Sequence, residues 1–260
     1  DPLLNHAVAA ELPAGSVFKL STAVGALNEG VVTPEQVIQT PGKITITEKY
    51  TPNDPGYERE FVDWNRAGFG ELDFLGGISN SSNVYFYKLG GGDKDEVPEG
   101  LGICRLGTYA EALGYGAYPG VELPDTADGQ IPDPTWKRIT HGENWAIGDT
   151  YIASVGQGFV IATPLQVLMS AATVANDGKL MEPTLIVAVT SFNPLIRRCA
   201  GILPKTLLSM STRILPPRVA VKPSSQVKRP QLSPGWSKRC NKGCVWPSPK
   251  GLLPSMQWDL

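Results

Sequence analysis

The sequence predicts a globular chain of mixed helix and strand in which helices dominate. Several segments carry apolar residues at helical spacing or begin at a capping sequence, whereas a single short segment alternates as a strand does. Hydrophobic residues make up 42% and charged residues 18% of the 260 residues, which is typical of a folded domain. No apolar run approaches the roughly 18 residues of a membrane-spanning helix, and the first residues do not resemble a signal peptide.

The first helix is predicted over residues 16–28, where Leu20, Val24 and Leu27 lie at helical spacing. Its end is marked by Asn-Glu-Gly at residues 28–30, a sequence that favours a left-handed cap. Residues 33–36, Thr-Pro-Glu-Gln, form a capping box with proline at the first helical position, so a short helix is predicted to begin there.

The middle of the chain predicts one strand and two consecutive helices. Residues 43–49 alternate polar and β-branched side chains as a strand or extended arm does, and residues 51–60 are predicted to be a polar loop. Residues 72–89 are apolar and aromatic, and polar residues at 79–83 divide them. The three glycines at 90–92 are a strong stop signal.

The following segments alternate between helix and loop. Residues 105–113 are amphipathic, whereas residues 114–150 are rich in Gly, Pro and Asp and predict a long surface excursion. A second capping box at residues 163–166 opens a helix that is predicted to run to residues 176–178.

The chemical character of the chain changes near residue 190. Residues 1–190 hold 11 Lys or Arg and 24 Asp or Glu, whereas residues 191–260 hold 12 Lys or Arg and one acid. Ten of the 23 prolines lie in residues 191–260. The net charge of one folded domain rarely changes sign so abruptly along the chain. We therefore predict two parts: a domain over residues 1–190, and a basic, Pro-rich, poorly ordered tail over residues 191–260.

We interpret this tail as a frameshifted segment. When codons for residues 235–251 are read one base earlier, they allow the peptide LVKALQQGLRLAVTEG, which is a clean amphipathic helix. A genuine basic tail is the alternative, and basic tails bind polyanions. The tail also carries three tryptophans without any period.

Two polar groups at the start of the first helix could carry chemistry. Ser16 and Lys19 lie one helical turn apart and therefore on the same face. A serine needs a base to become a nucleophile, and a lysine with a lowered pKa can serve. The helix N-terminus disfavours a charged lysine and stabilises developing negative charge. Alone, the pair is also compatible with a solvated lysine near a helix start.

A second polar group lies between the two apolar halves of residues 72–89. Ser81 and Asn83 offer a hydroxyl and an amide that could shuttle a proton and hold a substrate amide. The alternative is an ordinary turn between two helices, because Ser and Asn favour turns. His6, His141 and Asp149 have no local partners that indicate catalysis. No set of four metal ligands is recognisable among the cysteines and histidines, so no metal or cofactor is predicted.

Longer strings of sequence resemble a known family. Residues 2–7 followed by 12–19 (Leu-Pro-Ala-Gly-Ser-Val-Phe-Lys) are similar to the first active-site motif of class B penicillin-binding proteins and its lead-in. Residues 80–87 resemble their second motif, and residues 148–166 resemble the segment that follows. Trp136-Lys137, after a Pro-rich loop, is similar to the elongation-type subgroup. The resemblance runs in order from residue 1 to about residue 190.

The resemblance implies an α/β fold of the penicillin-binding protein and serine β-lactamase type, with mostly its helical part present and most sheet strands missing. It implies a peptidoglycan D,D-transpeptidase that cross-links stem peptides through an acyl-serine and is acylated by β-lactams. By the same resemblance, Ser16 is the nucleophile and Lys19 its base. Ser81 and Asn83 relay the proton and position substrate, and the backbone N–H of Ser16 is one oxyanion donor.

The third motif of this family, Lys-Thr/Ser-Gly, is absent from the sequence. Lys205-Thr206-Leu207 lacks the glycine and any strand pattern. Since that motif supplies the substrate carboxylate site, we expect this chain to be incomplete and inactive. Two alternatives stay open: a serine β-lactamase or D,D-carboxypeptidase, and a non-catalytic penicillin-binding sensor or inert fragment.

The resemblance also implies partners and a location. The partners are peptidoglycan stem peptides, β-lactams and, for the parent protein, a membrane glycosyltransferase. The parent would lie at the extracytoplasmic face of the cell membrane, held by an N-terminal helix that this sequence does not contain. The net charge of −2 indicates no nucleic-acid partner.

Overall fold

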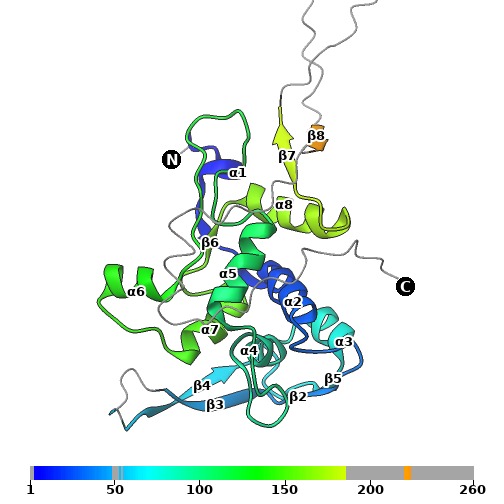
Figure 1. The fold of residues 1–260 in the computed structure, drawn as a ribbon, viewed down its shortest axis with the longest axis vertical. Coiled ribbons are helices and arrows are strands. Elements are labelled where there is room, and N and C mark those ends of the chain that lie inside the picture. Colours follow the sequence, from blue (N-terminus) through cyan, green and yellow to red (C-terminus); the bar gives the residue numbers. More distant parts are fainter. Residues whose placement is uncertain (1–2, 49–52, 54, 186–219, 224–260) are drawn as a thin grey trace, which may run out of the picture.

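The computed structural model describes residues 3–48, 53, 55–185 and 220–223. Helices gather around a central one, α2, and short strands lie toward the periphery (Figure 1). The helical elements are α1 (His6–Ala9), η1 (Gly15–Phe18), α2 (Lys19–Asn28), α3 (Phe74–Ser79), α4 (Asn83–Gly91), α5 (Gly102–Ala112), α6 (Pro134–His141), α7 (Ile147–Ser154) and α8 (Pro164–Ala175). The strands are β1 (Leu12–Pro13), β2 (Ile38–Thr40), β3 (Lys43–Glu48), β4 (Tyr57–Val62), β5 (Gly70–Leu72), β6 (Ile161–Ala162), β7 (Met181–Thr184) and β8 (Ala220–Pro223).

The described strands form four antiparallel pairs, β1 with β6, β2 with β5, β3 with β4, and β7 with β8. The β3–β4 hairpin is the longest, and its register joins Lys43 to Val62 and Glu48 to Tyr57. Strand β8 comes from the segment that the sequence predicts to be a tail. The mixture of helices with short strands confirms the predicted fold class for the part of the chain that the structure describes.

Helix α2 buries its small side chains and leaves its larger apolar ones half-exposed. The C-terminal end of α2 has the predicted left-handed cap, because Gly30 has φ +66° and the Val31 N–H donates to the Ala26 carbonyl at 2.8 Å. The predicted apolar stripe of residues 20, 24 and 27 is only half-buried. The fully buried residues are Lys19, Ser21, Thr22, Ala23, Gly25 and Ala26.

The small residues of α2 allow neighbouring helices to approach closely. A side chain on Gly25 would place its Cβ 2.7 Å from a methyl group of Leu101 and 2.9 Å from the ring of Tyr109. Thr22 donates a hydrogen bond of 2.7 Å to the Ser154 carbonyl at the end of α7. Helices α5 and α7 therefore both pack closely on α2, and α7 contacts its first turn, where the candidate site lies.

Aromatic rings join the β3–β4 hairpin to α4 and α7. The ring of Phe61 meets those of Tyr87 and Tyr151 edge-on at 5.7 and 5.1 Å, and the two tyrosine rings stack at 5.7 Å. Such pairs contribute about 0.5–1.5 kcal/mol each beyond their buried area. This cluster supports α4, whose N-terminus carries the second half of the candidate site.

Several predicted elements are confirmed. The strand at 43–49 is β3, the apolar halves of 72–89 are α3 and α4, and the segment at 105–113 lies almost entirely within α5. The second capping box is formed in full: the Thr163 hydroxyl accepts from the Gln166 N–H at 3.3 Å, and the Gln166 side chain accepts from the Thr163 N–H at 3.0 Å. Helix α8 ends where predicted, since Gly178 has φ +74°.

Three predictions were wrong. No helix begins at residues 33–36, because Gln36 instead donates from its side chain to the Glu96 carbonyl at 2.9 Å and the chain enters β2 to pair with β5. The predicted loop at 51–60 contains the start of β4, because these residues pair with β3 as an antiparallel strand. The segment 114–150 is not only surface, since it contains α6 and the nearly completely buried Lys137.

The boundary predicted near residue 190 and the interpretation of the tail as frameshifted lie largely outside the described residues and stay predictions. Within those that are described, no helix is both long and apolar enough to cross a bilayer.

Candidate active site

Three of the four predicted site residues meet at the start of α2. The ammonium group of Lys19 donates hydrogen bonds to the Ser81 carbonyl at 2.7 Å, the Ser81 hydroxyl at 3.1 Å and the Asn83 side-chain oxygen at 2.7 Å. Lys19 is only 4% exposed. Because an ammonium group has three hydrogens and three acceptors are present, the buried charge is fully satisfied.

Ser16 lies one turn before Lys19, in η1, and its side chain is exposed. Among the described residues its hydroxyl forms no hydrogen bond. It lines a small pocket of about 50 Å³ whose other lining residues are Lys19, Leu20, Ile78, Ser81 and Phe86. The hydroxyl that the sequence predicts as nucleophile thus borders the same pocket as the lysine and serine that could take its proton.

The environment of Lys19 favours its neutral form. Burial lowers the pKa of Lys19 from 10.5 to about 8, and the negative charge of Asp63 opposes that shift. With a pKa of about 8, about a tenth of the molecules carry a neutral amine at pH 7. The amine can therefore act as a general base near neutral pH, which an ordinary surface lysine cannot do.

The junction of α3 and α4 explains why Ser81 and Asn83, and not Ser82, face Lys19. Ser81 has φ +49°, a left-handed conformation that is uncommon for a non-glycine residue, and Ser82 is extended. The Ser82 hydroxyl bonds to Asp63, whereas its two neighbours bond to Lys19. Ser82 consequently caps α4, accepting from the Tyr85 N–H at 3.2 Å.

No pattern in the sequence singles out Asp63, which lies behind this junction. Its carboxylate accepts from the Ser82 hydroxyl at 2.6 Å. It is 19 residues away from Ser82 along the chain, at the end of β4, so no local pattern links the two.

The turn that carries Ser16 packs against a second glycine turn. The Gly15 N–H donates to the Gly156 carbonyl at 2.7 Å. A side chain on Gly156 would place its Cβ 2.2 Å from the Gly15 carbonyl oxygen and 2.5 Å from Phe18 Cβ. The sequence does not predict that residues 156–158 support Ser16.

The other polar residues singled out in the sequence do not line this pocket. His6 begins α1, and the ring of His141 packs on Trp136 and Phe159 at 5.1 and 4.8 Å. Asp149 accepts from the Ala146 N–H at 2.8 Å at the start of α7 and pairs with Lys137. In the described residues no cluster of histidine, cysteine and acidic side chains is arranged to hold a metal ion.

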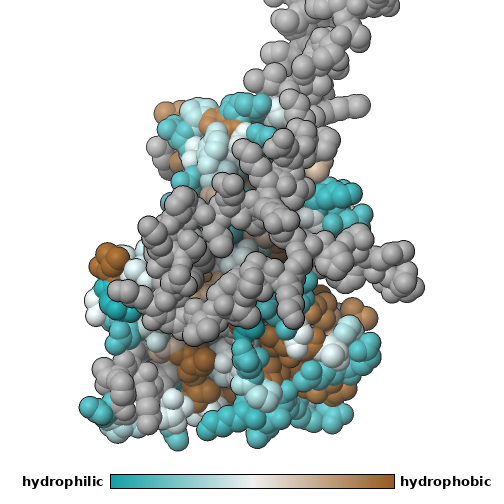
Figure 2. Space-filling view, in the orientation of Figure 1, coloured by the Kyte–Doolittle hydropathy of each residue, from teal (hydrophilic) through white to brown (hydrophobic). Residues whose placement is uncertain are grey.

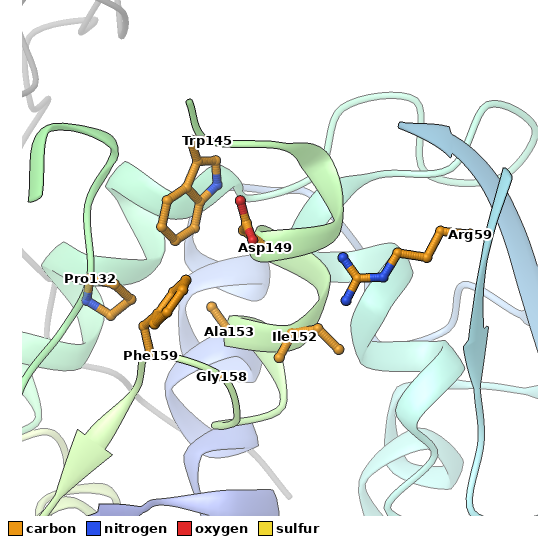
Figure 3. Close-up of a pocket in the computed structure, with 8 residues that line it drawn as sticks. All are labelled: Arg59, Pro132, Trp145, Asp149, Ile152, Ala153, Gly158 and Phe159. Atoms are coloured by element: carbon orange, nitrogen blue, oxygen red, sulfur yellow. The ribbon is translucent and has the colours of Figure 1, made fainter. Parts of the chain in front are cut away.

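A second cavity, of about 150 Å³, lies along α7; it shares no lining residue with the Ser16 pocket, and Asp149 is part of its lining. In Figure 3, Trp145, Pro132 and Phe159 form one side and Arg59 of β4 faces them across α7. The Trp145 N–H is already bonded to the Thr150 hydroxyl at 2.8 Å. The cavity is mainly apolar and has no serine, threonine, cysteine or lysine among its lining residues.

Comparison with known proteins connects this geometry to one family. The sequence model of the penicillin binding protein transpeptidase domain matches residues 1–230. The peptidoglycan D,D-transpeptidase MrdA of Acinetobacter baumannii is 33% identical over 199 residues, which cover 76% of this chain and 27% of that protein. MrdA of Escherichia coli K12 is 31% identical over 187 residues, with 72% and 27% covered. The chain thus spans about a quarter of the length of these relatives.

Solved structures agree. Penicillin-binding protein 2 of Pseudomonas aeruginosa, in complex with WCK 5153, has a TM-score of 0.59 and 34% identity, covering 68% of this chain and 35% of that one. A complex between penicillin-binding protein 2 and MreC from Helicobacter pylori gives a TM-score of 0.61 and 31% identity, covering 77% and 35%.

Proposed function

The chain belongs to the family of penicillin-binding protein transpeptidase domains, and from that membership we propose that it is part of a peptidoglycan D,D-transpeptidase with Ser16 as nucleophile. The observation that carries the proposal is the buried Lys19 amine, held by Ser81 and Asn83 beside Ser16. These are the residues on which the acyl-serine chemistry of this family would depend.

In the proposed first step, Ser16 Oγ attacks the carbonyl carbon of the penultimate D-alanine of a stem peptide. The neutral Lys19 amine accepts the hydroxyl proton as the Oγ–C bond forms. The C–N bond to the terminal D-alanine then breaks, and the leaving amine takes a proton that Ser81 relays from Lys19. A stem-peptide amine of a second strand would attack the acyl-serine, forming the cross-link and regenerating the Ser16 hydroxyl.

The remaining residues would bind and orient the substrate. The Asn83 amide group has hydrogens left over after its oxygen binds Lys19, and these can hold a substrate carbonyl. The backbone N–H of Ser16, at the start of a helical segment, can stabilise the developing oxyanion. A β-lactam would acylate Ser16 by the same attack, with ring opening in place of a leaving D-alanine.

The pocket favours transpeptidation over hydrolysis. A serine β-lactamase or carboxypeptidase needs a group that activates water against the acyl-serine. No carboxylate is present among the described residues that line the Ser16 pocket. The acyl-enzyme should therefore persist until an amine acceptor arrives.

The missing third motif predicts that this chain is inactive as a transpeptidase, and we propose that it retains at most slow acylation of Ser16. The described residues do not include a Lys-Thr/Ser-Gly strand to bind the substrate carboxylate, and Lys205-Thr206 lies outside them.

The proposed setting of the parent protein is the extracytoplasmic face of the cell membrane, with a glycosyltransferase as partner. This is supported by two solved relatives: one is described as a complex with MreC, the other as a synthase complex that coordinates polymerization and crosslinking. An inert fragment is the alternative for this chain.

Fluorescent penicillin tests the proposal directly. We expect slow covalent labelling of the purified chain, with the added mass on the peptide that contains Ser16 and no labelling of Ser16→Ala. A complete relative from this family serves as the positive control. Labelling that survives Ser16→Ala, or none after hours at millimolar penicillin, contradicts the proposal for this chain.

A further inference from the structure

We propose that Asp63 is a positioning residue of this active site, whose buried carboxylate holds Ser82 so that Ser81 and Asn83 both face Lys19. The inference rests on the proposed function, because it assigns a role within the same site. It concerns a residue that lies outside the motifs recognised in the sequence.

The contacts of Asp63 are directed at one short segment. One carboxylate oxygen accepts from the Ser82 hydroxyl at 2.6 Å and from the Val84 N–H at 2.9 Å. The other accepts from the Trp64 N–H at 2.7 Å. Asp63 is only 2% exposed. Water therefore competes little for these bonds, and charged hydrogen bonds of this length are among the stronger ones in proteins.

These contacts fix the conformation of residues 81–83, the catalytic segment that contacts Lys19. Ser82 donates to Asp63 while it accepts from the Tyr85 N–H at 3.2 Å, so its hydroxyl is held from two sides. Its neighbours Ser81 and Asn83 then project to the opposite side, toward Lys19. Ser81 has a left-handed backbone conformation there, with φ +49°. Such a conformation is strained for a residue with a side chain, so it persists only when surrounding contacts such as these hold it.

Asp63 is itself held by the chain on which it lies. Its N–H donates to the Gly42 carbonyl at 2.9 Å, next to the β3–β4 hairpin. The neighbouring Trp64 side chain donates to the Asn80 carbonyl at 3.1 Å, just before the catalytic segment. The end of β4 therefore supports the segment at Asn80, Ser82 and Val84.

The charge of Asp63 also reaches Lys19. Among the described residues it is the charged group that raises the pKa of Lys19 against the effect of burial. The carboxylate thus stabilises the protonated lysine while it positions the residues that bind it. Removing its charge but not its shape, in Asp63→Asn, should lower the pKa of Lys19.

A matched control is available in the preceding helix. Asp73 caps α3 and accepts from the Gly76 N–H at 2.7 Å, as Asp63 accepts from an N–H of α4. Asp73 does not bond to residues 81–83. Asp73→Asn therefore makes the same chemical change at a helix start without touching the proposed contacts.

The first experiment does not depend on activity. Amide hydrogen exchange and NMR titration of isotope-labelled lysine are followed in the full 260-residue chain. In Asp63→Asn we expect exchange at Val84 and Tyr85 to accelerate at least about tenfold and the Lys19 midpoint to move below its original value of about 8. Asp73→Asn should change neither. Unchanged exchange and an unchanged midpoint in Asp63→Asn overturn the inference.

The second experiment uses acylation by fluorescent penicillin. Asp63→Asn should lower the maximal rate about tenfold and shift the rising part of its pH profile to lower pH. Ser82→Ala removes both hydrogen bonds of the Ser82 hydroxyl, the one to Asp63 and the one from the Tyr85 N–H, and retains the carboxylate. It should therefore lower the rate and accelerate Tyr85 exchange without moving the midpoint. If Asp63→Asn does not fold, the Ser82→Ala variant provides the test instead. In that case, an exchange rate at Tyr85 equal to that of the wild type, in a folded Ser82→Ala protein, overturns the inference. If penicillin does not label the wild-type chain, that result contradicts the proposed function but not the role of Asp63. The hydrogen-exchange experiment still tests that role.

Discussion

The Lys19 ammonium group lies 2.7 Å from the side-chain oxygen of Asn83, although 64 residues of chain separate them. The contact joins the first turn of α2 to the first turn of α4. It is the point at which two short, individually common sequence patterns become one site. Most predictions about this protein follow from the packing that creates it.

Acylation should accelerate with rising pH. The base in the proposed mechanism is the neutral Lys19 amine, and its pKa is lowered to about 8. The neutral fraction, and with it the rate, should rise about tenfold between pH 7 and a plateau above about pH 9. The measurement is the second-order rate of penicillin acylation against pH. A flat or falling profile over this range is incompatible with Lys19 as the base.

Ser81→Gly should separate catalysis from stability. The left-handed conformation of Ser81 costs about 1–2 kcal/mol for a residue with a side chain but little for glycine. We expect the free energy of unfolding to stay within about 1 kcal/mol of the wild type, while loss of the relaying hydroxyl slows acylation about a hundredfold. Ser81→Ala is the control, since it loses the hydroxyl but keeps the strain. Wild-type acylation by Ser81→Gly would remove Ser81 from the mechanism.

Gly156→Ala should distort the turn that carries Ser16, the proposed nucleophile. The new Cβ would lie 2.2 Å from the Gly15 carbonyl oxygen, in addition to the cost of φ +71°. We expect a loss of about 2–4 kcal/mol in urea unfolding, together with slower acylation at Ser16. Gly178→Ala is a matched control, because Gly178 has φ +74° and no atom within 4 Å of its Cβ position. Equal losses in the two variants would show that backbone strain alone is responsible.

Lys137→Ala should destabilise the chain strongly. Lys137 is 2% exposed, and its ammonium group lies 2.7 Å from Asp149, which anchors the start of α7. Breaking such a buried pair leaves an uncompensated carboxylate and costs about 3–5 kcal/mol. The exposed pair of Lys43 with Glu60 provides the comparison, and Lys43→Ala should change urea unfolding by less than about 1 kcal/mol. A loss of less than about 1 kcal/mol in Lys137→Ala would contradict a stabilising role for the Lys137–Asp149 pair.

The chain should unfold at low temperature. Exposed apolar side chains surround the start of α2 and the neighbouring helices, with Leu12 57%, Val17 46% and Leu168 58% exposed. Apolar colour is also visible over the region of α3 in Figure 2. Because this surface has no covering layer among the described residues, we expect a broad thermal transition below about 45 °C. A sharp calorimetric transition at higher temperature would contradict this expectation.

The sequence alone determined the local features. Helical spacing predicts that Ser16 and Lys19 share one face, and the capping box at Thr163 and Gln166 predicts the start of α8, because both depend only on residues within one turn. Local signals failed where a distant strand competed, as at residues 33–36, where pairing of β2 with β5 replaced a predicted helix. They also did not show which face of α2 would be buried.

The tertiary structure alone decided which polar residues form a site. It brought Ser81 and Asn83 to Lys19, placed Asp63 behind Ser82, and lowered the pKa of Lys19 by burying it. Each of these effects depends on side chains that are far apart in sequence and adjacent only after packing. A sequence pattern can predict that a lysine lies one turn after a serine, but only the surrounding helices determine whether that lysine loses its water and becomes a base.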